Sequence, residues 1–197
     1  MKPRIPTLLA LALLGALSLS AACGGKQVKA LSIFDERLPP DSRRWVADAD
    51  DQIIVARAWR DEMRAHHADT RRWKNEVVAW MEWPQKSAAA RKAIDTLADQ
   101  RLTIAELERD KAETQFDLAL AKWELVMAET AMRHDIAIYE LAPLEERVKG
   151  YRAEIESIAK ELETEKLTLE KVEAEWWRAF AEFVKLGGRG EVLWVTK

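Results

Sequence analysis

Histidines and carboxylates are the side chains of this chain that are best suited to chemistry. The pairs His66-His67 and His134-Asp135 are of the types that ligate metal ions. Adjacent residues of a helix point about 100° apart, so His66 and His67 cannot readily bind one ion. We instead expect His66 to lie partly buried on a helix seam and His67 to be exposed. The many glutamates lie three or four residues from lysines or arginines, as on the solvated flanks of a coiled coil.

Motifs for catalysis are also missing from the sequence. The chain contains no Cys-x-x-Cys, no glycine-rich phosphate loop and no pattern that pairs a nucleophile with a base. We therefore predict that the protein is not an enzyme and that it uses no cofactor and no metal.

The single cysteine, Cys23, follows a segment that is typical of exported proteins. Residues 1–7 contain two basic side chains, and residues 8–19 are apolar and uncharged. This apolar run is too short to span about 30 Å of hydrocarbon, so it predicts a signal peptide and not a membrane-spanning helix.

The residues Leu19-Ser20-Ala21-Ala22-Cys23 resemble the lipobox of bacterial lipoproteins, although that family prefers Leu at the position of Ser20. The resemblance implies cleavage between Ala22 and Cys23 and acylation of Cys23, with palmitate-type chains. Gly24 resembles the residue that follows the cysteine in outer-membrane lipoproteins of the enteric type. We therefore expect a lipid-anchored protein of the outer membrane that faces the periplasm. The alternative is an ordinary secretory signal with the same cleavage site, which would leave Cys23 as an unpaired thiol.

Charge and composition limit the partners and the fold. With 31 basic and 34 acidic residues the chain has no basic excess, so we expect no nucleic-acid partner. Only 7 glycines and 6 prolines occur in 197 residues, too few for the turns of a β-sheet protein. The fold class is therefore predicted to be all-α, with long heptad-patterned helices in an antiparallel coiled-coil hairpin or a three-helix bundle.

The predicted organisation has four parts. A lipoprotein signal peptide spans 1–22, a tether 23–40, a helical coiled-coil domain 41–187 and a tail 188–197. Pro84 and Pro143 divide the helical domain into segments 41–83, 86–142 and 143–187. Asp41 or Ser42 is expected to cap the first segment. Pro84 marks a reversal of the chain, whereas Pro143 is compatible with either a reversal or a kink.

Apolar residues step by alternating fours and threes along the segments and so predict their buried seams. In the third segment the seam runs through Val148, Leu162, Trp176 and Phe183, and in the second through Leu97, Ile104, Lys111, Leu118 and Leu125. In the first segment it comprises Trp45, Ala49, Gln52, Ala56, Trp59, Met63, His66, Thr70, Trp73, Val77 and Trp80. Residues 57–92 are mainly basic and residues 140–175 mainly acidic. If the chain reverses at Pro143, these two stretches would lie side by side and attract each other, which slightly favours a reversal over a kink.

Nine tryptophans are far more than a chain of this length usually contains. Those on the first seam are expected in the core. At the far end of the domain, adjacent Trp176 and Trp177 cannot both face inward, and exposed aromatics mark partner sites. The candidate partner-binding aromatics are Trp83, Trp176, Trp177 and Trp194.

These features together predict a lipid-anchored coiled-coil protein of the cell envelope with a structural or scaffolding role. It would contact the membrane through its lipid and a protein partner, or a second copy, through its seams. The alternative is an accessory lipoprotein or adaptor of an envelope transport or assembly machine. The C-terminal Lys197 is similar to the lysine of the murein lipoprotein, and this similarity implies peptidoglycan as a further partner through a covalent link.

Overall fold

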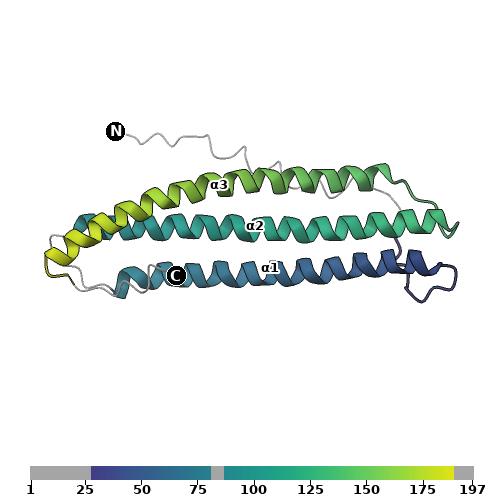
Figure 1. Cartoon of the computed structure of the whole chain (residues 1–197), viewed down its shortest axis with the longest axis horizontal. Helices are drawn as coiled ribbons and strands as arrows, with labels where there is room; N and C mark the ends of the chain where they lie inside the picture. The colour runs from purple at the N-terminus through teal and green to yellow at the C-terminus, as the bar shows by residue number, and fades with distance from the viewer. Residues whose placement is uncertain (1–27, 81–86, 189–197) are drawn as a thin grey trace, which may run out of the picture.

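The computed structural model describes residues 28–80 and 87–188 and contains three long helices in that part of the chain. They are α1 (Pro40–Trp80), α2 (Ala88–Arg133) and α3 (Ala142–Lys185), and they run up, down and up (Figure 1). The described residues form no strand. The predicted all-α fold of antiparallel long helices is therefore confirmed.

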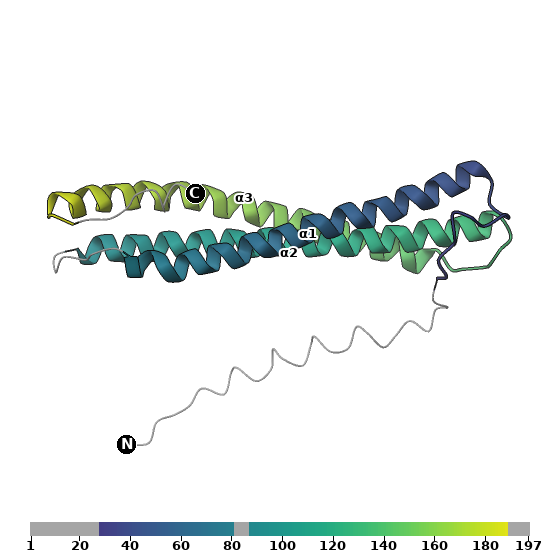
Figure 2. The ribbon, with the colours of Figure 1, turned by 90° about the horizontal axis from the view of Figure 1, so that it is seen from below.

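The helix α2 lies in the middle and packs against α1 on one side and α3 on the other, while α1 and α3 have very few contacts with each other. Figure 1 shows this arrangement as a single layer, and Figure 2 shows α1 crossing α2 in the perpendicular view, so the layer is twisted. The molecule is a rod with two distinct ends.

Small residues on opposite sides of α2 explain its central place. Ala98, Ala105, Ala112 and Ala119 recur every seven residues and are all buried. Thr114, Ala121 and Ala128 form a second buried column, also seven apart. The columns are offset by two residues, which is about 200° around a helix, so they lie on nearly opposite flanks. Two neighbours can therefore approach α2 closely, one along each column.

The seam of α1 differs from the predicted one. Ala49, Met63 and Val77 are buried as predicted, but Val46 is also buried and Ile53 is partly buried, one residue beyond the expected positions. Trp45 and Trp59 are 44% and 45% exposed. The prediction that they belong to the core is wrong, because a close-packed alanine column leaves no room for an indole ring and favours short side chains.

Arginines of α2 lie over two of the tryptophan rings of α1. The guanidinium of Arg133 lies 4.6 Å from the ring centre of Trp45, and that of Arg101 lies 5.2 Å from Trp73. The Trp73 ring also packs against the core at the far end. The side chain of Trp80 lies outside the described residues.

The predicted seam of α3 is confirmed, with Val148, Leu162, Trp176 and Phe183 all buried. The seam of α2 is buried at Leu97 and Ile104 but only half-buried at Lys111, Leu118 and Leu125. The two outer helices therefore cover this face of α2 at one end of the rod and leave it open toward the other.

The predicted attraction between the basic stretch 57–92 and the acidic stretch 140–175 is wrong, since α2 separates α1 from α3. Each stretch instead forms ion pairs with α2. Lys74 lies 2.6 Å from Asp99, and Arg101 lies 2.9 Å from Glu173.

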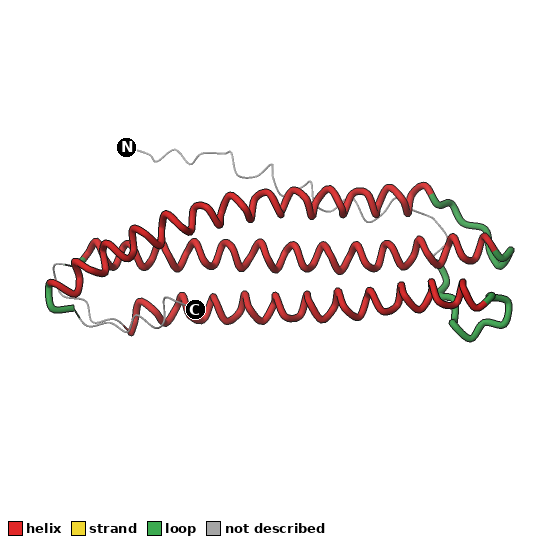
Figure 3. Tube along the Cα trace, in the orientation of Figure 1, coloured by secondary structure: helices red, strands yellow, loops and turns green. Residues whose placement is uncertain are grey.

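The chain reverses between α2 and α3 in a loop at 134–141 (Figure 3), so the region of Pro143 is a reversal and not a kink. The second helix therefore ends well before the predicted residue 142. Asp135 makes the turn with a φ of 53°. Its N–H donates to the carbonyl of Met132, and that of Ile136 donates to Ala131, which is the Schellman pattern.

The second half of the predicted tether packs on the rod. Leu38, Val46 and Met127 form a buried cluster with Val28 and Leu31 against it. The hydroxyl of Ser42 lies 2.8 Å from Nε2 of His134 and so joins α1 to the loop, in place of the predicted capping role. We call this end, where residues 28–39 and the loop meet, the tether end.

A short turn in the same segment contains Asp35, a carboxyl group with a lowered pKa. The Arg37 side chain donates to Asp35 and, together with the Arg37 backbone N–H, lowers the pKa of that carboxyl to about 2. Because this pKa is lowered, the pair of Asp35 and Arg37 stabilises the folded turn at pH values above the ordinary pKa of an aspartate. This contribution to stability is lost as the pH falls through about 2.

Asp135→Gly is expected to raise the free energy of unfolding, by up to about 1 kcal/mol, because glycine adopts positive φ without strain. Asp135→Ala is expected to lower it by about 1 kcal/mol. Urea unfolding followed by circular dichroism measures both. Gly187→Ala, at the matching turn after α3 with a φ of 85°, is the control and should also destabilise. A loss of stability in Asp135→Gly would contradict this role of Asp135.

Candidate interaction surfaces

Each of the three histidines contacts a different side chain. Nε2 of His66 is 3.8 Å from Glu108, and Nε2 of His67 is 3.6 Å from Glu106, both on α2. His66 is exposed and His67 is partly buried, the reverse of the predicted order. His134 contacts Ser42. Across residues 28–80 and 87–188 no three metal-ligating side chains come together.

Several of the predicted sites lie outside the described residues. These are the cleavage and lipidation residues Ala22 and Cys23, the aromatics Trp83 and Trp194, and the terminal Lys197. The structure therefore bears on the two remaining candidates, Trp176 and Trp177.

Trp176 belongs to the core at the end opposite the tether. It is fully buried together with Ile94, Leu97 and Phe183, next to Val77 of α1. Its ring centre lies 5.2 Å from that of Phe180. All three helices contribute to this cluster, so we call this end of the rod the closed end. The prediction of Trp176 as a partner-binding aromatic is wrong, because its ring is not on the surface.

Trp177 faces outward and is 42% exposed. Its ring meets that of Phe180 edge to face at 6.1 Å, so one edge of the indole is fixed by the core while the other faces solvent. The expectation that only one of the two adjacent tryptophans faces inward is confirmed.

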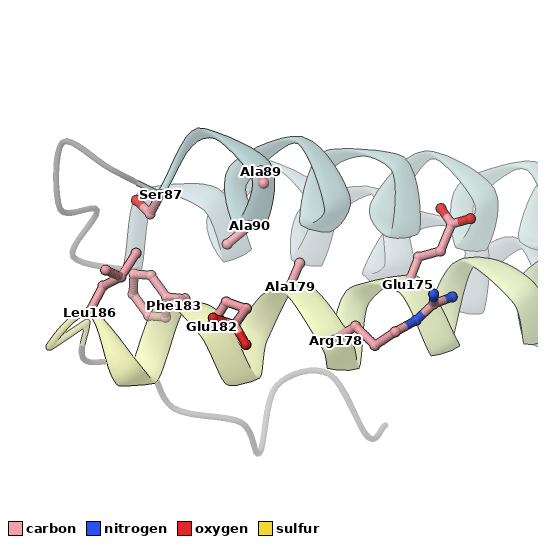
Figure 4. A pocket seen from close by; sticks show the side chains of 9 residues that line it. All are labelled: Ser87, Ala89, Ala90, Glu175, Arg178, Ala179, Glu182, Phe183 and Leu186. Carbon is pink, nitrogen blue, oxygen red and sulfur yellow. The ribbon is translucent and has the colours of Figure 1, made fainter.

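A groove of about 420 Å³ runs beside the aromatic core at the closed end. Figure 4 shows Phe183 and Leu186, at and just after the end of α3, facing Ser87 and Ala90, just before and at the start of α2. Glu175, Arg178 and Glu182 line the same groove. An apolar floor with charged walls suits the apolar face of an amphipathic segment.

A larger groove of about 590 Å³ lies between α1 and α2. We call it the open groove; its walls include Asp51, Val55 and Trp59 on α1 and Gln115, Leu118 and Lys122 on α2. Val55 is 68% exposed. Sequence analysis missed this groove because it placed Trp59 in a closed seam, although the heptad spacing of the alanines on α2 was a signal for it.

Searches of protein-family models, of curated proteins and of solved structures found no match to the chain. None of the helices in the described part is both long enough and apolar enough to cross a membrane.

Trp176→Ala and Trp177→Ala form a matched pair that separates core from surface. Loss of the buried Trp176 ring is expected to lower the free energy of unfolding by about 3–5 kcal/mol. Loss of Trp177 removes one edge-to-face contact and should cost about 1 kcal/mol. Thermal and urea unfolding of the two variants measures the difference. Equal destabilisation would show that Trp177 is a core residue.

Proposed function

We propose that this protein is a lipid-anchored protein of the cell envelope with a structural or scaffolding role, acting by binding and not by catalysis. The observation that carries the proposal is the difference between the two ends of the rod. Residues 28–38 pack at the tether end, while the aromatic cluster of Trp176 and Phe183 lies at the other end (Figure 1). The 41 residues of α1 make the rod about 60 Å long.

The anchor in this proposal is the acylated Cys23, which precedes the packed segment by five residues. Each buried CH₂ contributes about 0.8 kcal/mol, and more than one acyl chain gives stable anchoring. The lipobox resemblance and Gly24 support the outer membrane as the site of anchoring and the periplasm as the compartment that the rod faces. A rod held in this way would present Trp177 at the end away from its anchor.

A second candidate function is an accessory lipoprotein, or adaptor, of an envelope transport or assembly machine. It is favoured by Trp177 and by the groove beside Phe183, which lie at the same end of the rod. A partly exposed tryptophan that the core holds in place is the kind of side chain that contributes most to protein interfaces. In this case the partner would bind at the closed end.

Replacing Cys23 tests the anchor. In Cys23→Ala we expect the protein to move from the membrane fraction to the soluble fraction, and the acyl-modified N-terminal peptide to disappear, because no thiol remains to be acylated. Fractionation and mass spectrometry of the purified chain measure the two effects. Gly25→Ala, two residues away, is the control and should keep both. Membrane association of Cys23→Ala equal to that of the unaltered chain, or no acyl group on Cys23, would refute the anchor.

Replacing Trp177 tests the adaptor function. Trp177→Ala should weaken the cross-linked capture of a partner from envelopes while the protein still folds, because the ring that would enter the partner is gone. Ile54→Ala is the control, since Ile54 is 64% exposed on α1 but distant in sequence from the aromatic end. Capture that is unchanged in Trp177→Ala would count against a partner at the closed end.

A further inference from the structure

The apolar columns of α1 and α2 are buried at the closed end and become more exposed at the open groove. On α2 the column of Leu97 and Ile104 is almost completely covered at the closed end, whereas Leu118 of the same column is only half-buried. On α1 the column of Trp73 and Trp59 behaves in the same way, with Trp73 packed on the core and Trp59 45% exposed. Beyond the polar positions Lys111 and His66, the two columns return to apolar residues, Leu118 and Trp59, which the helices of the described chain cover only in part.

We propose that a second copy of this chain covers the open groove, so that the α1 wall of each copy lies on the α2 wall of the other. The axis of this two-fold pairing would run along the groove. Such an interface is isologous, so the same residues must be complementary to one another across the axis.

The charges on the groove walls meet this requirement. Asp51 lies on the α1 wall and Lys122 on the α2 wall. The two lie at one level of the rod, because the neighbouring Trp123 donates from Nε1 to Asp50 at 2.7 Å. Neither Asp51 nor Lys122 has an ion-pair partner among the described residues. A two-fold axis along the groove exchanges the walls and brings Asp51 of each copy to Lys122 of the other.

The apolar residues on the closed-end side of these charges supply the rest of the contact. Val55 and Trp59 lie one and two turns beyond Asp51, and Leu118 lies one turn from Lys122 on the facing wall. The pairing would cover Val55, which is 68% exposed in the single chain, and would place the charged pairs toward the rim.

The pairing and its parallel orientation rest on the charges of the groove walls and not on the proposed lipid anchor, with which they are compatible. A two-fold axis along the rod leaves both copies pointing the same way, so both tether ends can reach one membrane. The walls from Asp51 to Trp59 span only about 12 Å, so we expect a weak, concentration-dependent dimer. Anchoring in one membrane would raise the effective concentration of the copies.

Charge reversal tests the pairing on the full mature chain in mild detergent. Asp51→Lys and Lys122→Asp each place two like-charged pairs across the axis and should weaken dimerisation at least about tenfold in sedimentation velocity. An equimolar mixture of the two variants restores both opposite-charge pairs and should dimerise as the unaltered chain does. Charges that act only within one chain would give no recovery on mixing.

Matched variants keep the result interpretable if a charge reversal disturbs folding. Trp59→Ala should weaken the dimer with little change in thermal unfolding, while Ile54→Ala and Arg57→Glu, on the same helix but outside the groove, should leave the dimer intact. A chain that stays monomeric at every concentration, or a mixture that fails to recover, would overturn the proposal and leave the groove to another helical protein or to residues 189–197. The fractionation of Cys23→Ala is independent of either result, so failure here and failure of the anchor can be told apart.

Discussion

The close approach of two helices to opposite flanks of α2 is the constraint on which the rest of the structure depends. The buried columns of Ala98, Ala105, Ala112 and Ala119 and of Thr114, Ala121 and Ala128 contribute little apolar area, but they let α1 and α3 pack tightly on either side. A helix with small residues on both flanks keeps its neighbours apart along most of its length, and they share a core only at the closed end. The single layer, the displaced tryptophans of α1 and the open groove all follow from this arrangement.

The same constraint makes the two ends of the rod different. At the closed end bulky residues, Trp176 and Phe183 of α3 and Val77 of α1, meet around Ile94 and Leu97 of α2. At the tether end residues 28–38 and the loop that starts at His134 cover Met127 instead. Between them the face of α2 around Leu118 is only half-buried by the described residues. One candidate surface therefore lies at the closed end, where the core is complete but the Trp177 ring faces outward. The other is the open groove, where the core is incomplete.

The helices and the seam of α3 could be predicted from the sequence because heptad spacing and proline positions are local signals. The seam of α1 could not, because Trp45 and Val46 compete for the same contact and the opposing surface decides between them. Asp135 could not be predicted as the turn residue, because its role depends on its φ of 53°, whereas the local sequence signal for a break is Pro143. For the candidate surfaces, the sequence predicted that one of Trp176 and Trp177 is exposed but not which one. The open groove could not be predicted, because it depends on which helix lies in the middle.

The distance between α1 and α3 tests the central claim most directly. Spin labels at Ala58→Cys and Ser157→Cys, in a Cys23→Ala chain diluted with unlabelled protein, report the open half; labels at Asn75→Cys and Ala174→Cys report the closed end. With α2 between its neighbours, the first pair should be separated by about two interaxial distances, roughly 16–20 Å before the length of the labels, and the second pair should be closer. Equal short distances at both ends would show a closed three-helix bundle along the whole rod and would contradict the account.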